Sequence, residues 1–243
     1  MVLFEPETLR MLTGSPSRRR AYLDGLLANW YEDGAALLRR YERVLTQRNN
    51  LLKQAHTMST QSLDDQLFAW DVSLAELASV IEERRRAIVE GINETISREY
   101  SHIAQKSATA HLHYVASHAH SEAAYLHVLK EHRRIDVMRA HTTIGPHRSD
   151  FSVQLDGQAA ETTASRGEQR SIVLALKYIE ISQLTRLAGT PPLVLLDDVM
   201  SELDKTRQQQ LLQRTDLPQV ILTTAFLPSS LQQKKSHIIT LND

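Results

Sequence analysis

The sequence predicts an α/β protein that combines a lobe built on a parallel sheet with a long helical arm. Three observations carry this prediction: heptad-spaced apolar residues in the first half of the chain, alternating strands and helices after residue 165, and a continuous apolar run at 193–196. Such a run is typical of a parallel strand buried on both faces. We expect residues 1–30 to belong to the head of the molecule, 31–135 to form the helical arm, and 136–243 to form the C-terminal lobe of the head.

The composition is that of an ordinary globular protein. Of the 243 residues, 23% are charged and 42% are apolar, and the formal net charge is −1. The whole chain therefore gives no electrostatic argument for nucleic acid, and only a local basic patch could give one. The lack of cysteine excludes disulfides and thiolate zinc sites. No apolar run reaches the roughly 18 residues that a membrane span needs, and we expect a cytoplasmic protein without a membrane partner.

The first 30 residues predict a strand followed by a helix. Val2–Phe4 has the character of a short strand, which needs a sheet to join and therefore indicates that upstream sequence is absent. Ser15 suits the N-cap of the following helix, and Pro16 suits its first helical position.

Two heptad patterns predict an antiparallel pair of long helices, separated by the polar stretch 53–62. Arg48 occupies a core position of the first pattern. A helical bundle domain and a protruding coiled-coil arm both satisfy the spacing, and the sequence leaves both open. The apolar positions of the first pattern are Leu37, Tyr41, Val44 and Leu51, and those of the second are Leu63, Leu67, Trp70, Leu74, Leu77 and Ile81, with a continuation through Ile88, Ile92 and Ile96.

The second half predicts a hairpin and then an α/β pattern. Alternating apolar residues before Asp156-Gly157 are a strong hairpin signal. Gly189 and the two prolines after it end the next helix. The other expected elements are a strand at 111–117, helices at 119–139, 167–187 and 204–215, and strands at 193–196, 220–222 and 237–241.

Two adjacent carboxylates, Asp197 and Asp198, follow the apolar run. This is the form of a Walker B strand, in which Asp197 would hold Mg²⁺ and Asp198 would orient or deprotonate an attacking water. The alternative is that Asp198 merely begins a turn after an ordinary core strand. Ser201 and Asp204 follow closely; they satisfy a capping box, and they also fit the loop that reaches a partner subunit in ABC-type ATPases.

The stretch from Ser165 to Gln169 begins a helix. Ser165 and Glu168 also make a capping box, but capping does not explain Gly167, which costs up to about 1 kcal/mol relative to Ala inside a helix. Close approach of a ligand to the backbone would explain it. The amides of a helix N-terminus suit a phosphate, and Arg166 would add positive charge.

The order of these motifs resembles the C-terminal lobe of ABC-type ATPase heads. Other stretches resemble the RecF family in particular: Gly145-Pro146-His147-Arg148 with its flanks, residues 14–24 after Phe4-x-Pro6-Glu7, and residues 41–52. The resemblance covers nearly the whole chain in the right order. It implies the C-terminal half of an ABC-type ATPase head with a coiled-coil arm.

The resemblance also implies a function. RecF proteins are ATP-dependent DNA-binding proteins of recombinational repair, which dimerise around two ATP molecules and act with RecO and RecR at gapped DNA, where single strand and duplex meet. By this likeness Ser165, Arg166, Gly167 and Gln169, with Ser201 and Asp204, would contact ATP bound by the other protomer. Asp197 would hold Mg²⁺ and Asp198 would be catalytic.

The sequence departs from the family in one important respect. None of its eight glycines is followed by lysine, so the P-loop motif Gly-x-x-x-x-Gly-Lys is lacking. We therefore expect little ATP binding or hydrolysis by this chain alone, which would be a gene fragment, a split-gene half or a decayed copy. Two other functions stay open, a non-catalytic interaction module and a fragment of another SMC-like ATPase, although residues 145–148 argue against the latter.

Basic residues and histidines give weaker signals. Arg18, Arg19 and Arg20 lie in a first helical turn, where cations oppose the helix dipole. Such a cluster, together with Arg148, could bind DNA, or it could form a solvated or ion-paired face. Nine of the 11 histidines lie between 102 and 147. Their spacing matches no familiar metal site, and exposed helix positions are the favoured explanation.

Overall fold

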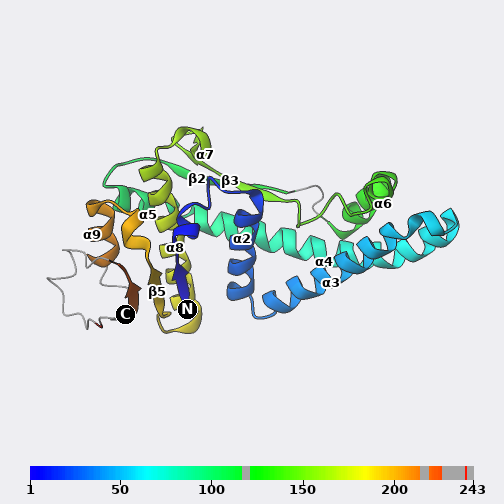
Figure 1. Ribbon diagram of the computed structural model, residues 1–243, viewed down its shortest axis with the longest axis horizontal. Helices are drawn as coiled ribbons and strands as arrows, with labels where there is room; N and C mark the ends of the chain where they lie inside the picture. Colours follow the sequence, from blue (N-terminus) through cyan, green and yellow to red (C-terminus); the bar gives the residue numbers. More distant parts are fainter. Residues whose placement is uncertain (117–120, 214–218, 226–238, 240–243) are drawn as a thin grey trace. The chain divides into compact units, whose positions relative to one another are not determined.

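The structure, a computed structural model, describes residues 1–116, 121–213, 219–225 and 239 (Figure 1). The chain divides into two compact units. The head unit comprises residues 1–13, 95–111 and 154–243, and the arm unit comprises residues 14–94 and 112–153. Residues 14–30 and 136–153, expected in the head, thus group with the arm unit, and residues 95–111, expected in the arm, group with the head unit.

The head unit is built on a parallel sheet of three strands, β1 (Val2–Phe4), β5 (Val194–Asp197) and β6 (Val220–Thr223). Their order is β1-β5-β6, so the acid-ended strand is central. The N-terminal strand pairs in parallel with β5, with Val2 opposite Val194 and Phe4 opposite Leu196. The expected parallel sheet is therefore confirmed, as are the strands expected at 2–4, 193–196 and 220–222.

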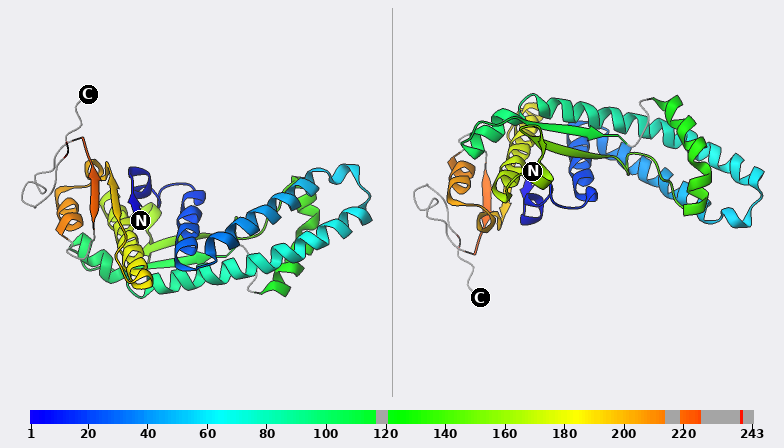
Figure 2. Two further views of the ribbon diagram at one scale, coloured as in Figure 1. Left: turned by 90° about the horizontal axis from the view of Figure 1, so that it is seen from below. Right: turned by 90° about the horizontal axis from the view of Figure 1, so that it is seen from above.

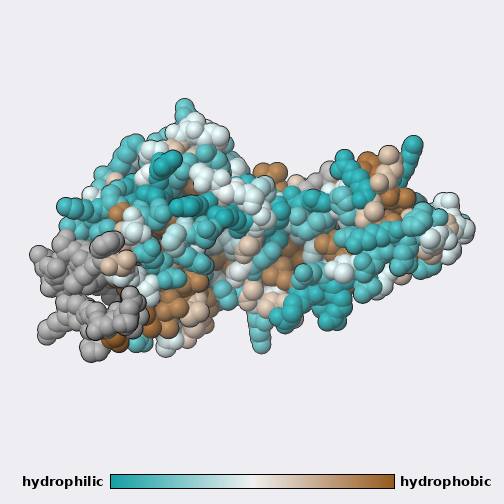
Figure 3. Space-filling model, viewed as in Figure 1, coloured by the Kyte–Doolittle hydropathy of each residue, from teal (hydrophilic) through white to brown (hydrophobic). Residues whose placement is uncertain are grey.

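The longest helix of the head unit, α8 (Arg166–Ala188), lies along this sheet (Figure 2). The rings of Phe4 and Tyr178 meet with centroids 6.5 Å apart. On the other face of the sheet, Leu3 and Ile221 are 37% and 48% exposed, and Figure 3 shows apolar surface over this part of the unit. The shorter elements are α1 (Pro6–Leu9), α5 (Ile96–Ala104), α7 (Ala160–Thr163), the 3-10 turn η2 (Val199–Glu202) and α9 (Lys205–Gln213).

The arm unit contains the two predicted long helices, α3 (Gly34–Lys53) and α4 (Thr60–Asn93), which lie side by side (Figures 1 and 2). The turn η1 (Ala55–Thr57) joins them, and α2 (Pro16–Trp30) and α6 (Glu122–Arg139) complete the unit. The heptad positions of α3 and α4 are buried, as predicted, except for Val44 and Trp70, which are half-buried. The second heptad pattern does not continue as one helix, because α4 ends at Asn93 and α5 begins at Ile96.

A second sheet has the order β2-β3-β4, with β2 at Ala110–Val115, β3 at Asp150–Leu155 and β4 at Gln158–Ala159. The predicted hairpin is β3–β4, whose turn residues Asp156 and Gly157 both have positive φ. The boundaries between the two units fall within β2 and β3. The strand expected at 237–241 lies outside the described residues except for Ile239. No helix in the described ranges is both long enough and apolar enough to cross a membrane.

Candidate functional site

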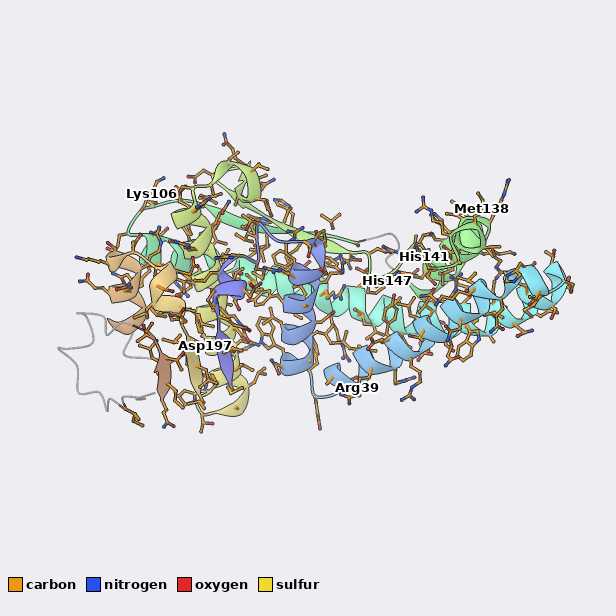
Figure 4. All side chains as sticks on the ribbon, in the orientation of Figure 1. Arg39, Lys106, Met138, His141, His147 and Asp197 are labelled. Carbon is orange, nitrogen blue, oxygen red and sulfur yellow. The ribbon has the colours of Figure 1, made fainter. Side chains whose placement is uncertain are left out.

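The acid pair lies at the C-terminal end of the central strand. Asp197 is the last residue of β5, and its Oδ1 accepts a hydrogen bond of 2.5 Å from the hydroxyl of Thr223 on β6. Asp198 has a left-handed backbone (φ 47°), which turns the chain into η2, and its amide donates to the Thr223 carbonyl. Figure 4 marks Asp197 at this strand end. Both residues are exposed.

This exposure changes the argument for a cation. We expected the carboxylates to be costly at the end of a buried strand unless an ion were present. The apolar side chains Val194 and Leu196 are buried, but the two carboxylates reach solvent and need no counter-ion for stability. What remains in favour of Mg²⁺ is the donor chemistry, since this ion is commonly held by one or two carboxylates together with water and phosphate oxygens.

The predicted capping box begins α8. The Ser165 hydroxyl accepts from the Glu168 amide at 3.3 Å, and the Glu168 carboxylate accepts from the Ser165 amide at 2.9 Å. Lys106, labelled in Figure 4, places its Nζ 3.2 Å from the same carboxylate. The hydrogen bonds from Ser165, followed by that from Lys106, lower the pKa of Glu168. Glu168 therefore stays ionised and completes the cap at neutral pH.

Arg207, which the sequence analysis did not single out, lies against the first turn of α8. A Cβ on Gly167 would stand only 3.0 Å from its Nη2 atom. The Arg207 Nε donates to the Ser171 hydroxyl at 2.8 Å, and Nη1 is ion-paired with Asp204. The glycine thus allows a close approach by another part of the same chain. The only sequence signal for Arg207 was its i,i+3 spacing from Asp204 at a helix start.

A second arginine makes a parallel connection. Glu202, in η2, accepts hydrogen bonds from Arg170 on α8 and from Arg10, the latter at 3.0 Å. One ion pair, Arg170–Glu202, and one hydrogen bond, from Arg207 to Ser171, therefore join the segment after β5 to the first turns of α8. The structure thus brings the glycine-bearing helix start and this loop together.

The remaining predicted residues have defined places. Asp204, rather than Ser201, caps α9, because its carboxylate accepts from the Arg207 amide at 2.9 Å. The Ser201 hydroxyl donates to the Asp198 carbonyl at 2.8 Å. Arg166 is exposed, whereas Gln169 is buried, and its amide donates to the Ala160 and Glu161 carbonyls.

The predicted DNA-contacting arginines belong to the arm unit and differ from one another. Arg19 forms a two-pronged ion pair with Asp150, at 2.9 and 2.6 Å. Arg20 donates to the Ser149 carbonyl at 3.4 Å, whereas Arg18 and Arg148 are exposed. Within the described ranges, no group of three or more histidines, aspartates or glutamates is arranged to hold a metal.

Comparison with known proteins supports the family resemblance that the motifs indicate. No family model matches the chain. It is 37% identical over 221 residues to the DNA replication and repair protein RecF of Herpetosiphon aurantiacus, covering 90% of this chain and 57% of the relative. It is 38% identical over 234 residues to the RecF of Heliobacterium modesticaldum, covering 93% and 62%.

A solved structure of the recombination mediator protein RecF with ATP, in the RecFOR pathway, superimposes with a TM-score of 0.81 at 29% identity. The match covers 93% of this chain and 62% of that one, so the chain spans about three fifths of the proteins it matches. The predicted fold class is confirmed. The chain belongs to the RecF family of DNA replication and repair proteins, and it corresponds to their C-terminal portion.

Proposed function

We propose that this chain supplies the trans half of a nucleotide site and the helical arm of an ATP-dependent DNA-binding protein of recombinational repair. In this role two protomers would enclose ATP, and the assembly would help to load recombinase at gapped DNA with RecO- and RecR-type partners. The observation that carries the proposal is the two contacts that join α8 to the segment after β5, the Arg170–Glu202 ion pair and the hydrogen bond from Arg207 to Ser171.

The start of α8 would bind phosphate of a nucleotide held by the partner. Helix N-termini attract anions through their amides and the helix dipole. The capping box fixes this helix start, and Ser165 and Arg166 are both exposed residues there. The buried Gln169 would act mainly by holding α7 against α8, because its amide donors are used within the head unit.

Asp197 and Asp198 would act on the nucleotide that their own protomer binds. Mg²⁺, when bound, would neutralise developing charge on the phosphates. Asp197 would ligate it, and Thr223 would orient that carboxylate through the 2.5 Å hydrogen bond. Asp198 would accept a proton from, or orient, the attacking water. The P-loop needed for phosphate binding in cis is not part of this sequence, so we expect no turnover by these 243 residues alone.

The experiment joins the chain to a RecF-type P-loop segment and measures the ATP affinity and the ATP turnover of the joined protein. Asp198→Asn should leave ATP affinity near that of the unaltered protein and lower turnover by roughly 10²-fold or more, as expected for loss of a general base. Asp65→Asn, an exposed carboxylate on α4, is the matched control and should change neither. Unchanged turnover in Asp198→Asn would remove Asp198 from the mechanism.

A non-catalytic interaction module is the second candidate, and the lack of any Gly-Lys pair favours it. In that case the joined protein would fail to hydrolyse ATP while the unaltered chain still bound DNA or protein partners.

A further inference from the structure

The connection from α6 into β3, residues 142–150, ends on the first residue of β3, and we call it the 142–150 loop. It is held by side chains from four helices of the arm unit. At its beginning, the Thr142 amide donates to Asn49 Oδ1 at 2.7 Å, and the Thr142 hydroxyl accepts from Arg48 Nη1 at 2.8 Å. Both the amide and the hydroxyl of Thr143 donate to Asp136, at 2.9 and 2.6 Å. This end of the loop is therefore fixed to α3 and α6.

The centre of the loop is fixed as well. Gly145 has φ 136°, and a Cβ there would stand 2.5 Å from the Tyr41 hydroxyl oxygen. The Pro146 carbonyl accepts from Arg85 on α4 at 2.6 Å. His147 lies between the Tyr41 hydroxyl, 2.7 Å from Nδ1, and the Thr142 carbonyl, 3.1 Å from Nε2. Because a carbonyl only accepts, Nε2 carries the proton and Nδ1 accepts from Tyr41.

The end of the loop is held in the same way. The Ser149 hydroxyl donates to buried Glu82, which also accepts from Tyr114 at 2.6 Å. Asp150 is ion-paired with Arg19. Eight of the nine loop residues thus have buried or half-buried positions, and the exposed one is Arg148.

Arg148 differs from its neighbours in what its side chain does. Its amide donates to the Gly145 carbonyl at 2.7 Å, which fixes the turn, but in the described part of the chain its guanidinium makes no hydrogen bond or ion pair. Arg20 lies at the same turn, because its Nη1 donates to the carbonyl of Ser149, the residue after Arg148, at 3.4 Å. After burial, these two cations are the charges that lower the pKa of His147. The carboxylates around them are engaged elsewhere: Asp150 with Arg19, and Asp24 with Arg85. The result is a local excess of positive charge that the net charge of −1 conceals.

We propose that the 142–150 loop holds the backbone of Arg148 in a fixed position, and that Arg148, together with Arg20 at the same turn, contacts a phosphate of the nucleic-acid backbone. The planar guanidinium fork matches two phosphate oxygens. A loop that is already ordered loses little conformational freedom on binding, so the contact costs mainly the ordering of one side chain. This inference rests on the proposed DNA-binding function and names a residue for it.

The test is the binding of the 243-residue chain to a fluorescein-labelled duplex with a single-stranded extension, followed by anisotropy between about 50 and 200 mM salt. Arg148→Ala should weaken binding and reduce the magnitude of the log K against log salt slope by about 1, the value for one lost phosphate contact. Arg148→Lys should restore the slope but not the full affinity, because it keeps the charge and loses the fork. Arg39→Ala, an exposed arginine of α3 labelled in Figure 4, is the matched control and should leave the slope unchanged.

The outcomes separate this inference from the function on which it rests. DNA binding by the unaltered chain with equal slopes for Arg148→Ala and Arg39→Ala would overturn the inference alone. Absence of binding by the unaltered chain would overturn both. Equal competition by inorganic phosphate and by DNA of the same phosphate concentration would show a small-anion site and also overturn it. Unfolding midpoints should be the same for Arg148→Ala and the unaltered chain, since Arg148 supports no other residue of the loop through its side chain.

Discussion

The guanidinium of Arg207 lies against the backbone of Gly167, with Nη2 3.0 Å from the place that a Cβ would take. Asp204 and Ser171 hold the guanidinium there. This contact explains a glycine in the first turn of α8, where alanine would be the better helix former by about 1 kcal/mol. It also means that the glycine is needed for contact between two motifs, whether or not a ligand approaches it.

Gly167→Ala should therefore gain less stability than its helix propensity indicates. Arg207 must move by a few tenths of an ångström, which weakens its bond to Ser171. Gly25→Ala is the matched control, because it lies within α2 with no atom within 4 Å of the added Cβ, and it should raise the free energy of unfolding by about 0.5–1 kcal/mol. Urea denaturation measures both; equal gains would mean that Arg207 imposes no constraint.

Gly145→Ala should be strongly destabilising. The positive φ of 136° and the 2.5 Å approach to the Tyr41 hydroxyl act together, and we expect a loss of more than about 2 kcal/mol. Gly157→Ala separates the two causes, because it has φ 79° but open space around it. It should lose only about 1 kcal/mol. Similar losses in the two variants would contradict the packing part of the explanation.

Arg48→Ala should be among the most damaging changes in the arm unit. The Arg48 side chain is fully buried, and it pairs with Asp71 and Asp136, each at 2.7 Å. Its removal leaves two buried carboxylates without this partner, at a cost of about 3–5 kcal/mol. Arg39→Ala, on the exposed side of the same helix, should change stability by no more than about 0.5 kcal/mol. Thermal and urea unfolding would show the contrast; a small loss for Arg48→Ala would mean that water reaches the cluster.

His147 should make stability depend on pH. Burial is the main cause that lowers the pKa of His147 to about 4, against about 6.5 in the unfolded chain. Between these values the unfolded state binds more protons, so stability is fully present above pH 6.5 and is lost as pH falls toward 4. The loss attributable to this residue would be at most about 3 kcal/mol.

The variant His147→Gln should flatten this part of the pH profile, measured by urea denaturation at a series of pH values. His127→Gln is the control, because His127 lies on the exposed surface of α6. If the profile kept its slope in His147→Gln, other groups would be responsible for the acid sensitivity.

Local signals in the sequence were sufficient for much of the fold. The heptads predicted α3 and α4, Ser165 and Gly189 predicted the ends of α8, and Asp156-Gly157 predicted the β3–β4 turn. Each of these depends on residues within a few positions of one another, where periodicity and capping act. The joint between α4 and α5 was missed because the apolar spacing continues across it.

The sequence by itself determined the elements, the order of the motifs and the likeness to RecF, because each of these depends on residues that are close together in the chain. Only the tertiary structure decided which groups meet. Arg48 finds its carboxylates 23 and 88 positions away, Arg207 reaches Gly167 from another helix, and Asp197 and Asp198 end in solvent although their strand is buried. Partner choice and exposure depend on how distant segments pack, and no local pattern in a chain encodes that packing.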